Sequence, residues 1–394
     1  RFIEKHILKG LVMFAGASIM LTSCKENFLD ADPLSFYEPT TTFSTEAGLQ
    51  SVLAIADRQL KRYWTDGDND AMSPLMSEYT FSDLMVPAAT DKTDLLDNVA
   101  QKLTINSDQS TLLNLSRVST LWFFWQQTYE GIRNANTILT YIDNVTSLSQ
   151  DTKNMYIGRA YFHRAFRYYL LLFQYGDVPL MTKVLDIPKL NFRSTKRDAV
   201  LNMLVKDMEF AVQWVPDQKD MSLIGMVNKG ACRMLLSKLY LATGEYEKAK
   251  QQLDILINES GYSLMTEDFG KFNDGGVPKT WTITRNIIWD LHRPENKLIS
   301  ANKEVIMGMP NRGAAAESFL KNLTMRVLYP FYFDSRVKMP DGKQALLNIK
   351  RNSADYNENY DYMRAMGRGI ATCRPTWFYQ KGVWMVNGQM DATD

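Results

Sequence analysis

Apolar positions recur with the spacing of a helix in three long segments of the chain. The first segment, residues 41–64, begins behind Ser44 as the expected N-cap and places five apolar residues on one face: Leu49, Val52, Leu53, Ala56 and Leu60. The second, residues 119–145, keeps that spacing from Trp122 to Ile142. The third, residues 154–180, closes with Gly176 and Pro179, which is a normal helix stop. The pattern predicts three helices that each bury one face.

The most regular pattern lies at residues 235–262, where two helical stripes flank Gly244. Small residues at a helix crossing, and an aromatic followed by alanine after the turn, are typical of the tetratricopeptide repeat. Arg233 stands where the consensus has tryptophan, but seven positions fall in register: Leu236, Ser237, Tyr240, Gly244, Tyr246, Ala249 and Leu253. The stretch predicts a helix-turn-helix repeat, with more degenerate copies earlier in the chain.

Beyond residue 262 the pattern becomes irregular. Glycine, proline and asparagine mix with aromatic residues, and residues 303–310 (KEVIMGMP) alternate as a strand would. Long irregular segments inside a compact protein tend to carry function. We therefore expect binding loops within residues 263–394.

A basic flank at the N-terminus precedes an apolar run at residues 10–21, followed by Cys24. A bilayer-spanning helix needs about 20 apolar residues, so this run suits the shorter core of a signal peptide. The sequence LTSC at residues 21–24 resembles the lipobox of bacterial lipoproteins, in which cleavage falls before a lipidated cysteine. We expect residues 1–23 to be a removed signal peptide, Cys24 to carry lipid, and residues 24–43 to form a tether. The alternatives are an ordinary signal peptide with an incidental cysteine, or a short buried helix.

Composition narrows the possible partners. With 45 Lys and Arg against 44 Asp and Glu, the formal net charge is +1, which argues against a nucleic-acid partner or a polybasic membrane surface. No later segment reaches transmembrane length. Cys232 lies where a small apolar helix residue is expected, so we interpret it as a core residue. A Cys232–Cys373 disulfide is the alternative.

Histidine is scarce once the leader is set aside. His163 lies four residues from both Arg159 and Arg167, which suggests a solvated polar stripe on a helix. For His292 the sequence leaves two interpretations, a structural hydrogen bond or a contact in a binding site. Neither histidine has metal-ligand spacing, and nucleophilic catalysis with a histidine base would have to use one of them.

The sequence does not exclude glycoside hydrolysis, because a glycosidase needs only two suitably spaced carboxylates. Asp66, Asp68 and Asp70 alternate like the start of a calcium-binding EF-hand loop. However, Ala71 replaces its glycine and Ser77 its final glutamate, so a solvated acidic loop is the preferred interpretation. We expect no cofactor and no bound metal.

The abundance of aromatic residues, with 8 Trp, 19 Tyr and 19 Phe, suits sugar binding. Pyranose rings stack on flat aromatic faces, while amides, carboxylates and arginines bind their hydroxyls. Trp122, Trp125 and Trp214 fit helix packing instead. The candidate ligand-binding residues are aromatics next to polar or irregular sequence, with nearby hydrogen-bonding partners: Tyr63, Trp64, Asp66, Asn69, Trp281, Trp289 and Arg293.

Several blocks resemble the SusD/RagB group of Bacteroidetes outer-membrane lipoproteins, in the order expected for that family. CKENFLD at 24–30, followed by Pro33, is similar to its mature start, and YEGIRNANTIL at 129–139 to one of its helices. GRAYFHRAFRYYLLLFQYGDVPL at 158–180 resembles its most recognisable block, and NKGACRMLLSKLYLATGEYEKAK at 228–250 the repeat that follows. Arg159 follows Gly158 at a position where members of this family commonly have a glutamate-alanine pair. Members usually continue past residue 394.

The resemblance implies a mainly α fold of tetratricopeptide-like helix pairs, residues 44–262, packed against a less regular, loop-rich half with minor β structure, residues 263–394, whose C-terminal part is missing. It also implies a non-enzymatic, lipid-anchored protein of the outer membrane. Such a protein would face the cell exterior, bind oligosaccharide and deliver it to a SusC-type TonB-dependent transporter. A lipid-anchored glycan hydrolase, a peptide-binding relative and a pure helix-repeat scaffold are the alternatives.

Overall fold

The computed structural model describes residues 42–63, 82–87, 120–185, 189–273, 275, 281–309, 338–343 and 373–390. Four of the predicted site residues, Cys24, Trp64, Asp66 and Asn69, lie outside these ranges, as do Asp68 and Asp70 of the acidic loop. All the elements named below belong to one compact unit, residues 43–394.

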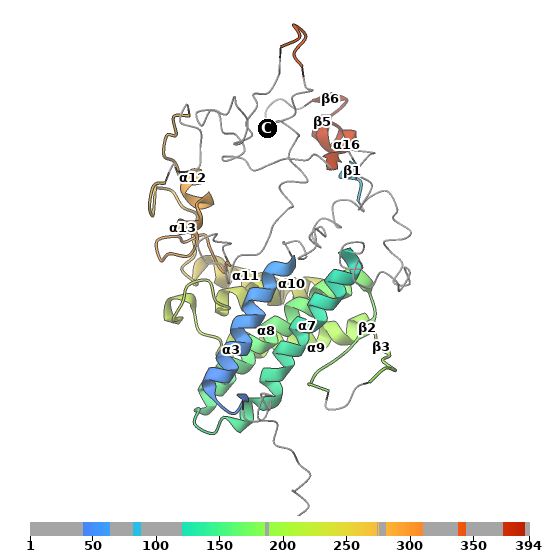
Figure 1. The fold of residues 1–394 in the computed structure, drawn as a ribbon, viewed down its shortest axis with the longest axis vertical. Helices are drawn as coiled ribbons and strands as arrows, with labels where there is room; N and C mark the ends of the chain where they lie inside the picture. The colour runs from blue at the N-terminus through green and yellow to red at the C-terminus, as the bar shows by residue number, and fades with distance from the viewer. Residues whose placement is uncertain are drawn as a thin grey trace, which may run out of the picture. The chain divides into compact units, whose positions relative to one another are not determined.

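Helices dominate the described part of the chain (Figure 1). The long helices are α3 (Glu46–Leu60), α7 (Thr120–Tyr141), α8 (Gln150–Tyr175), α9 (Arg197–Trp214), α10 (Lys229–Thr243) and α11 (Tyr246–Asn258). Shorter helices are α12 (Ile287–His292), α13 (Pro294–Lys297) and α16 (Trp377–Gln380), with 3-10 turns η3 (Lys61–Tyr63), η5 (Ile142–Asn144), η6 (Gln218–Asp220) and η8 (Gly382–Trp384). Within the described ranges no helix is long and apolar enough to cross a membrane.

The described strands are short and pair only in twos. The antiparallel pairs are β1 (Met85–Pro87) with β4 (Cys373–Pro375), β2 (Val178–Pro179) with β3 (Ser194–Thr195), and β5 (Met385–Val386) with β6 (Gln389–Met390). The prediction of a mainly α fold with minor β structure is therefore confirmed.

Helix α3 forms as the apolar spacing predicts, with one correction at its start. All five stripe residues are buried, and burial of each leucine or valine side chain among them contributes about 1.5–3 kcal/mol. The N-cap is Thr45 and not Ser44: its side-chain oxygen accepts a hydrogen bond from the Gly48 amide at 3.2 Å. A cap one residue later still satisfies an amide that the helix leaves unpaired.

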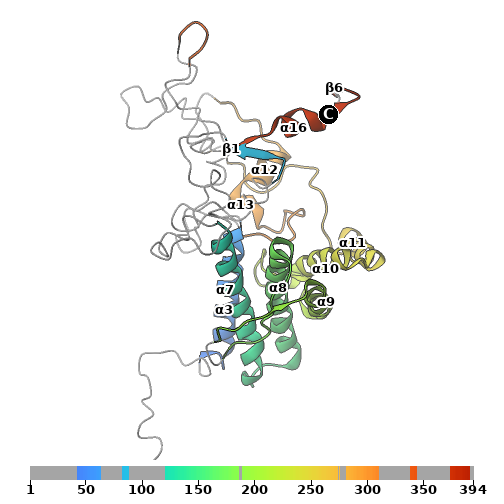
Figure 2. The same ribbon diagram turned by 90° about the vertical axis from the view of Figure 1, so that its right-hand side faces the viewer.

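The long helices contact their neighbours in sequence order, from α3 through α7, α8, α9 and α10 to α11. Figure 2 shows α3, α7 and α8 running alongside one another, as does Figure 1, from which it is turned by 90° about the vertical axis. A small cluster of buried residues joins α3, α7 and α8, and a larger one runs from α7 to α11. Cys232 is a buried free thiol in the larger cluster, as predicted.

Helices α10 and α11 form the predicted helix-turn-helix. Gly244 ends α10 with φ +80°, a left-handed conformation that glycine adopts without strain, and its amide bonds back to the carbonyl of Leu241. Leu236, Tyr240 and Ala249 are buried in register. Tyr246 departs from the pattern, because it is 66% exposed.

The predicted strand at residues 303–310 is wrong for the part described, residues 303–309, which contain no strand. Their carbonyls bond to side chains of the helical half: Asn228 Nδ2 donates to Ile306 at 2.6 Å, and Gln218 Nε2 to Val305 at 3.3 Å. These contacts satisfy backbone groups that a strand would have paired with a neighbouring strand. They also fasten the irregular half to the N-cap of α10 and to the 3-10 turn η6.

Candidate functional site

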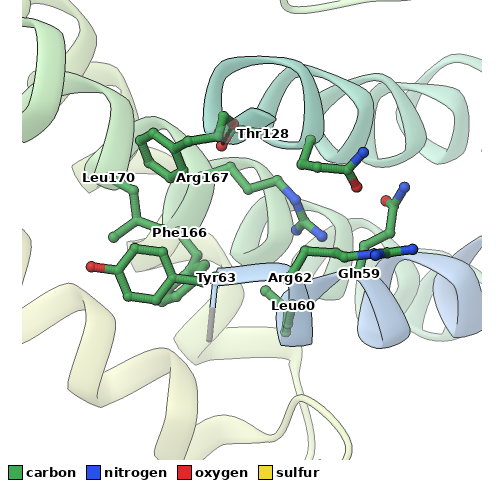
Figure 3. A pocket seen from close by; sticks show the side chains of 10 residues that line it. Gln59, Leu60, Arg62, Tyr63, Thr128, Phe166, Arg167 and Leu170 are labelled. Atoms are coloured by element: carbon green, nitrogen blue, oxygen red, sulfur yellow. Dashed lines mark hydrogen bonds between the residues drawn. The ribbon is translucent and has the colours of Figure 1, made fainter. Parts of the chain in front are cut away.

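Helix α3 ends beside a small surface hollow that contains the predicted site residue Tyr63. The hollow holds about 20 Å³, enough for one water-sized group. We call it the Tyr63 hollow and define it by the ten residues that line it: Gln59, Leu60, Arg62, Tyr63, Phe124, Gln127, Thr128, Phe166, Arg167 and Leu170. Figure 3 shows Gln59, Arg62 and Arg167 on one side of the view, with Tyr63, Phe166 and Leu170 on the other. The hollow therefore has a polar side and an aromatic side.

The aromatic side rests on packed rings. Tyr63 lies against Phe124 with ring centroids 6.1 Å apart, and Phe124 stacks on Tyr175 at 6.0 Å. Phe124 is buried, whereas Tyr63 stays half-buried at the surface. This packing fixes the position of the Tyr63 ring and leaves part of it open to solvent, as sugar stacking requires.

The polar side depends on Arg167, which reaches the hollow from α8 and is only 4% exposed. One terminal nitrogen, Nη2, donates to the carbonyl of Ala56 in α3 at 2.9 Å; the other, Nη1, donates to His163 Nδ1 and to the His163 carbonyl, both at 3.1 Å. The stem passes across Gly131, where a Cβ atom would overlap the Nε, Cδ and Cζ atoms of Arg167. Arg167 thus ties α3, α7 and α8 together directly beneath the hollow.

The prediction that His163 lies on a solvated stripe is wrong, because His163 is 0% exposed. Its Nε2 lies 2.9 Å from Asp57 Oδ1, and Arg159 Nη2 lies 3.2 Å from Asp57 Oδ2. Since arginine can only donate, His163 Nδ1 must accept from Arg167, and Nε2–H then donates to Asp57. Spacing alone could not distinguish this network, because a polar stripe looks the same whether it faces water or a carboxylate on another helix.

Burial and neighbouring charges keep His163 neutral and Asp57 ionised. Burial lowers the pKa of His163, the charges of Arg167 and Arg159 lower it further, and Asp57 offsets only part of this. Burial alone would raise the pKa of Asp57. The hydrogen bond from His163 and the charges of Arg159 and Arg167 outweigh burial and hold that pKa below its ordinary value.

A second, larger cleft of about 520 Å³ lies between one face of α7 and the extended segment that follows β2. Its lining mixes charge and apolar surface, and includes none of the predicted site residues: Gln126, Tyr129, Glu130, Ile132, Arg133, Asn136, Met181, Lys183, Val184 and Leu185. Asn136 holds the segment by donating to the Met181 carbonyl at 2.9 Å. Tyr129 donates to the Pro179 carbonyl at 2.8 Å and packs on Trp125, so its ring offers little free face.

Behind this cleft a buried ion pair fixes the same segment. Arg164 Nη2 lies 2.7 Å from Asp207 Oδ2, and Arg164 Nη1 donates to the Thr182 carbonyl at 3.3 Å. Burial raises the pKa of Asp207, and the Arg164 charge and hydrogen bond offset only part of that effect. The pair therefore joins α8 to α9 and to the wall of the cleft.

The structure brings Trp289 and Arg293 together in the irregular half. The Arg293 guanidinium lies over the Trp289 ring, 5.4 Å from its centroid, and Arg293 Nη2 lies 3.6 Å from Glu295 Oε1. The Trp289 indole donates to the Asn273 carbonyl at 3.1 Å. One face of this tryptophan is thus occupied by the chain's own arginine, and its N–H is already used.

The other residues of the irregular half have simpler roles. Trp281 is half-buried. His292 is exposed, and its Nδ1 lies 2.8 Å from the Ile288 carbonyl one turn earlier, which is the structural hydrogen bond that we weighed for it. Three predicted site residues lie in the irregular half: Trp281, Trp289 and Arg293. Trp289 and Arg293 contact each other, and neither lines the Tyr63 hollow.

Arg62, Gln127 and Arg167 line the hollow but were not predicted as site residues. Arg62 could have been found from its place beside Tyr63 at a helix end. Gln127 and Arg167 could not, because only the packing of α7 and α8 against α3 brings them there.

A sequence profile of the SusD-like family, described as starch-binding and associating with the outer membrane, matches residues 27–241. Two curated relatives are SusD-like protein P2 of Formosa agariphila, 25% identical over 274 residues, and a SusD-like protein of Bacteroides ovatus, 26% identical over 285 residues. These alignments cover 68% and 67% of this chain, and 50% and 47% of the relatives. The chain spans about half the length of these relatives.

Solved structures of similar fold include a laminarin-binding SusD-like protein and surface glycan-binding protein A from Bacteroides thetaiotaomicron. Both are 20% identical to this chain. Their TM-scores are 0.43 and 0.44, with 56% and 57% of this chain and 46% and 45% of theirs covered. The profile match covers more than half of the chain and carries the conclusion on its own: the chain belongs to the SusD-like family of starch-binding proteins that associate with the outer membrane.

Proposed function

We propose that this protein binds oligosaccharide outside the outer membrane, is anchored there by lipid on Cys24, and passes its ligand to a SusC-type TonB-dependent transporter. The observation that carries the proposal is the profile match over residues 27–241, because that family is described by starch binding and outer-membrane association. The transporter partner and the orientation follow from the family resemblance of the sequence.

Within the described residues the Tyr63 hollow fits a glycan contact best. It combines a held aromatic ring with side-chain amides from Gln59 and Gln127, and with the guanidinium of Arg62. Its volume of about 20 Å³ admits one substituent of a sugar, so the ring itself would lie across the opening and against Tyr63. Trp289 and Arg293 form a second, separate candidate contact.

A hydrolase is less well supported by the same residues. A general acid needs a carboxyl group that can hold and release a proton near the working pH. Three buried or half-buried carboxylates of the described residues each pair with a cation: Asp57 with Arg159, Asp207 with Arg164, and Asp290 with Arg285. Burial raises the pKa of Asp207, but its carboxylate lies 2.7 Å from Arg164 and is enclosed between α8 and α9. These pairs favour structural roles for all three carboxylates.

Binding is tested by retention of the protein in gels that contain a polysaccharide, together with an assay for released reducing ends. Tyr63→Ala is expected to weaken retention with little change in melting temperature. Tyr246→Ala removes an exposed tyrosine at the start of α11 and is the matched control that should bind normally. Release of reducing ends that stops when one carboxylate is replaced would contradict a binding-only role. Equal retention of both variants would remove Tyr63 from the site.

Anchoring is tested by expressing the chain with its leader in a bacterium that processes lipoproteins. The wild type should fractionate with membranes and take up labelled fatty acid, because multiple acyl chains hold a protein stably where a single chain does not. Cys24→Ser should abolish labelling and release the protein. Membrane-bound, unlabelled wild-type protein would refute the lipid anchor.

A further inference from the structure

The larger cleft beside α7 has the room for a sugar that the Tyr63 hollow lacks. Its volume is about 520 Å³, against about 20 Å³ for the hollow. Ligand pockets in proteins commonly hold about 300–1,000 Å³. The ten residues that line the cleft all belong to the described ranges. The hollow therefore admits one substituent of a sugar, whereas the cleft admits whole rings.

The wall of the cleft opposite α7 is held in place by the protein itself. The Met181 amide donates to the Tyr168 hydroxyl at 2.6 Å, and the Val184 amide donates to Thr140 Oγ1 at 3.4 Å. These bonds add to those that the carbonyls of residues 181–182 make with side chains of α7 and α8. A wall that is already ordered costs less conformational entropy when a ligand binds against it.

A row of planar polar side chains faces this wall from α7. Gln126, Glu130 and Arg133 follow one another at intervals of four and three residues, which places them on one helix face over a length of about 10 Å. Gln126 is exposed and forms no hydrogen bond within the described ranges. Glu130 Oε1 and Arg133 Nη2 lie 3.9 Å apart and are open to solvent, so both can still bind a ligand. Amide, carboxylate and guanidinium groups suit the hydroxyls of a sugar.

The rest of the lining complements what the Tyr63 hollow provides. Val184 and Leu185 supply aliphatic surface for the C–H groups of a sugar. Tyr129 is the aromatic residue of the lining, but its hydroxyl is already bound and its ring is packed on a neighbouring tryptophan. The cleft thus offers room and hydroxyl partners without a free ring, and the hollow offers a ring without room.

The two sites lie on neighbouring faces of the same stretch of α7. Gln127 and Thr128 line the hollow, whereas Gln126 and Tyr129 line the cleft. An α-helix with its side chains is about 10–12 Å across. A glycan chain of a few sugar units is long enough to reach across that distance.

We infer that the larger cleft is a second saccharide site, and that one glycan chain occupies the cleft and the Tyr63 hollow at the same time. This inference rests on the proposed function and extends it to a second face of α7. Joint occupancy raises the affinity, because a chain held at one site reaches the other at an effective concentration set by the sugars that link them.

The length of the chain tests whether the two sites act together. Titration calorimetry with maltooligosaccharides and laminarioligosaccharides, from the disaccharide to the octasaccharide, measures affinity and stoichiometry. For the series that binds, affinity should rise about 10-fold or more at the length that reaches both sites, with a single octasaccharide bound per protein. An affinity that does not depend on length would overturn the joint occupancy.

Gln126→Ala and Gln150→Ala form a matched pair of variants. Both remove an exposed glutamine from a long helix, and Gln150, at the start of α8, lines neither site. Gln126→Ala should lower the affinity for the octasaccharide about 5-fold, and Gln150→Ala by less than about 2-fold. Melting temperatures check that both variants fold as the wild type does. Equal affinities of the two variants would overturn the inference.

The remaining outcomes separate the inference from the function on which it rests. Weaker binding of the octasaccharide in Tyr63→Ala, with no loss in Gln126→Ala, would overturn the second site and leave glycan binding at the hollow intact. A loss in Gln126→Ala alone would overturn the joint occupancy. Wild-type protein that binds neither sugar series and is not retained in polysaccharide gels would contradict the proposed function itself. Tryptic casein peptides that bind the wild type and not Gln126→Ala would assign the cleft to peptides and overturn the saccharide site.

Discussion

The side chains beneath the Tyr63 hollow form a buried network whose protonation state is set by arginine. Arg167 donates to His163, and His163 donates to Asp57, which also binds Arg159. A proton on His163 Nδ1 would face another donor at 3.1 Å, so the network excludes charged histidine. Because Arg167 also holds the Ala56 carbonyl, the state of this network affects the end of α3.

His163 should make the protein less stable as pH falls below about 6.5, its ordinary pKa. The unfolded chain takes up a proton near that pH, whereas the folded chain, with its lower His163 pKa, does so only at lower pH. Between the two values the unfolded state binds more protons, so the free energy of unfolding falls by up to about 1.4 kcal/mol per pH unit. Denaturant titrations from pH 8 to pH 5.5 measure this slope.

His163→Asn should flatten that pH dependence, since an amide can donate to Asp57 and accept from Arg167 without titrating. His292→Asn is the control, because it replaces an exposed histidine outside this network. If His163→Asn and the wild type lose stability in parallel, the network does not contain a neutral histidine.

Gly131→Ala should cost about 1–3 kcal/mol of unfolding free energy, because its Cβ would displace the buried stem of Arg167. Urea denaturation of the single variants and of the double variant with Arg167→Ala measures the coupling. In the Arg167→Ala background the alanine at position 131 should be tolerated. A penalty of the same size in both backgrounds would show that the two residues do not compete for space.

Among individual residues, apolar patterns predicted burial well, whereas polar patterns did not. Leu49, Val52 and Leu53 are buried as the helical spacing indicated. His163 and Arg167 looked solvated because their partners on α3, Asp57 and the Ala56 carbonyl, lie 106 and 111 residues away in sequence. Local spacing carries no information on such a partner, and so the polar side of the hollow was missed.

Helices α10 and α11 illustrate how a turn determines the packing of an element pair. Gly244 has φ +80°, and a Cβ added there would meet nothing within 4 Å. Any cost of substitution therefore comes from backbone strain and not from a clash.

Gly244→Ala should lower the free energy of unfolding by about 1–2 kcal/mol, the penalty of a left-handed residue with a Cβ. Gly244→Asn should cost less, because asparagine tolerates this conformation better than alanine. Urea denaturation of the two variants measures the difference. Alanine that is as stable as glycine would mean that the turn relaxes out of the left-handed region.

Long, regular elements could be predicted from sequence, and short irregular ones could not. The helix pair around Gly244 followed from register alone, and the N-cap of α3 was misplaced by one residue because Ser44 and Thr45 are both good caps. Residues 303–309 alternate like a strand, but Asn228 and Gln218 bind their carbonyls. The alternation of apolar and polar residues does not reveal which donor groups form hydrogen bonds to those carbonyls.

For the whole molecule, the two halves have distinct physical characters. The helices from α3 to α11 pack around two clusters of buried residues, and Asn228 and Gln218 fasten the irregular half to these helices. The candidate binding residues at the end of α3 are thus placed by a packed scaffold, as is usual for binding sites. Candidate ligand sites on this scaffold include the Tyr63 hollow and the larger cleft beside residues 181–185.

Hydrogen exchange with and without a saturating oligosaccharide locates the ligand most directly. If the ligand binds at the Tyr63 hollow, amide exchange should slow in peptides covering residues 57–63 and 166–170 and stay unchanged in residues 246–258 of α11. Slower exchange confined to residues 181–185 and the facing side of α7 would place the ligand in the larger cleft and contradict the account.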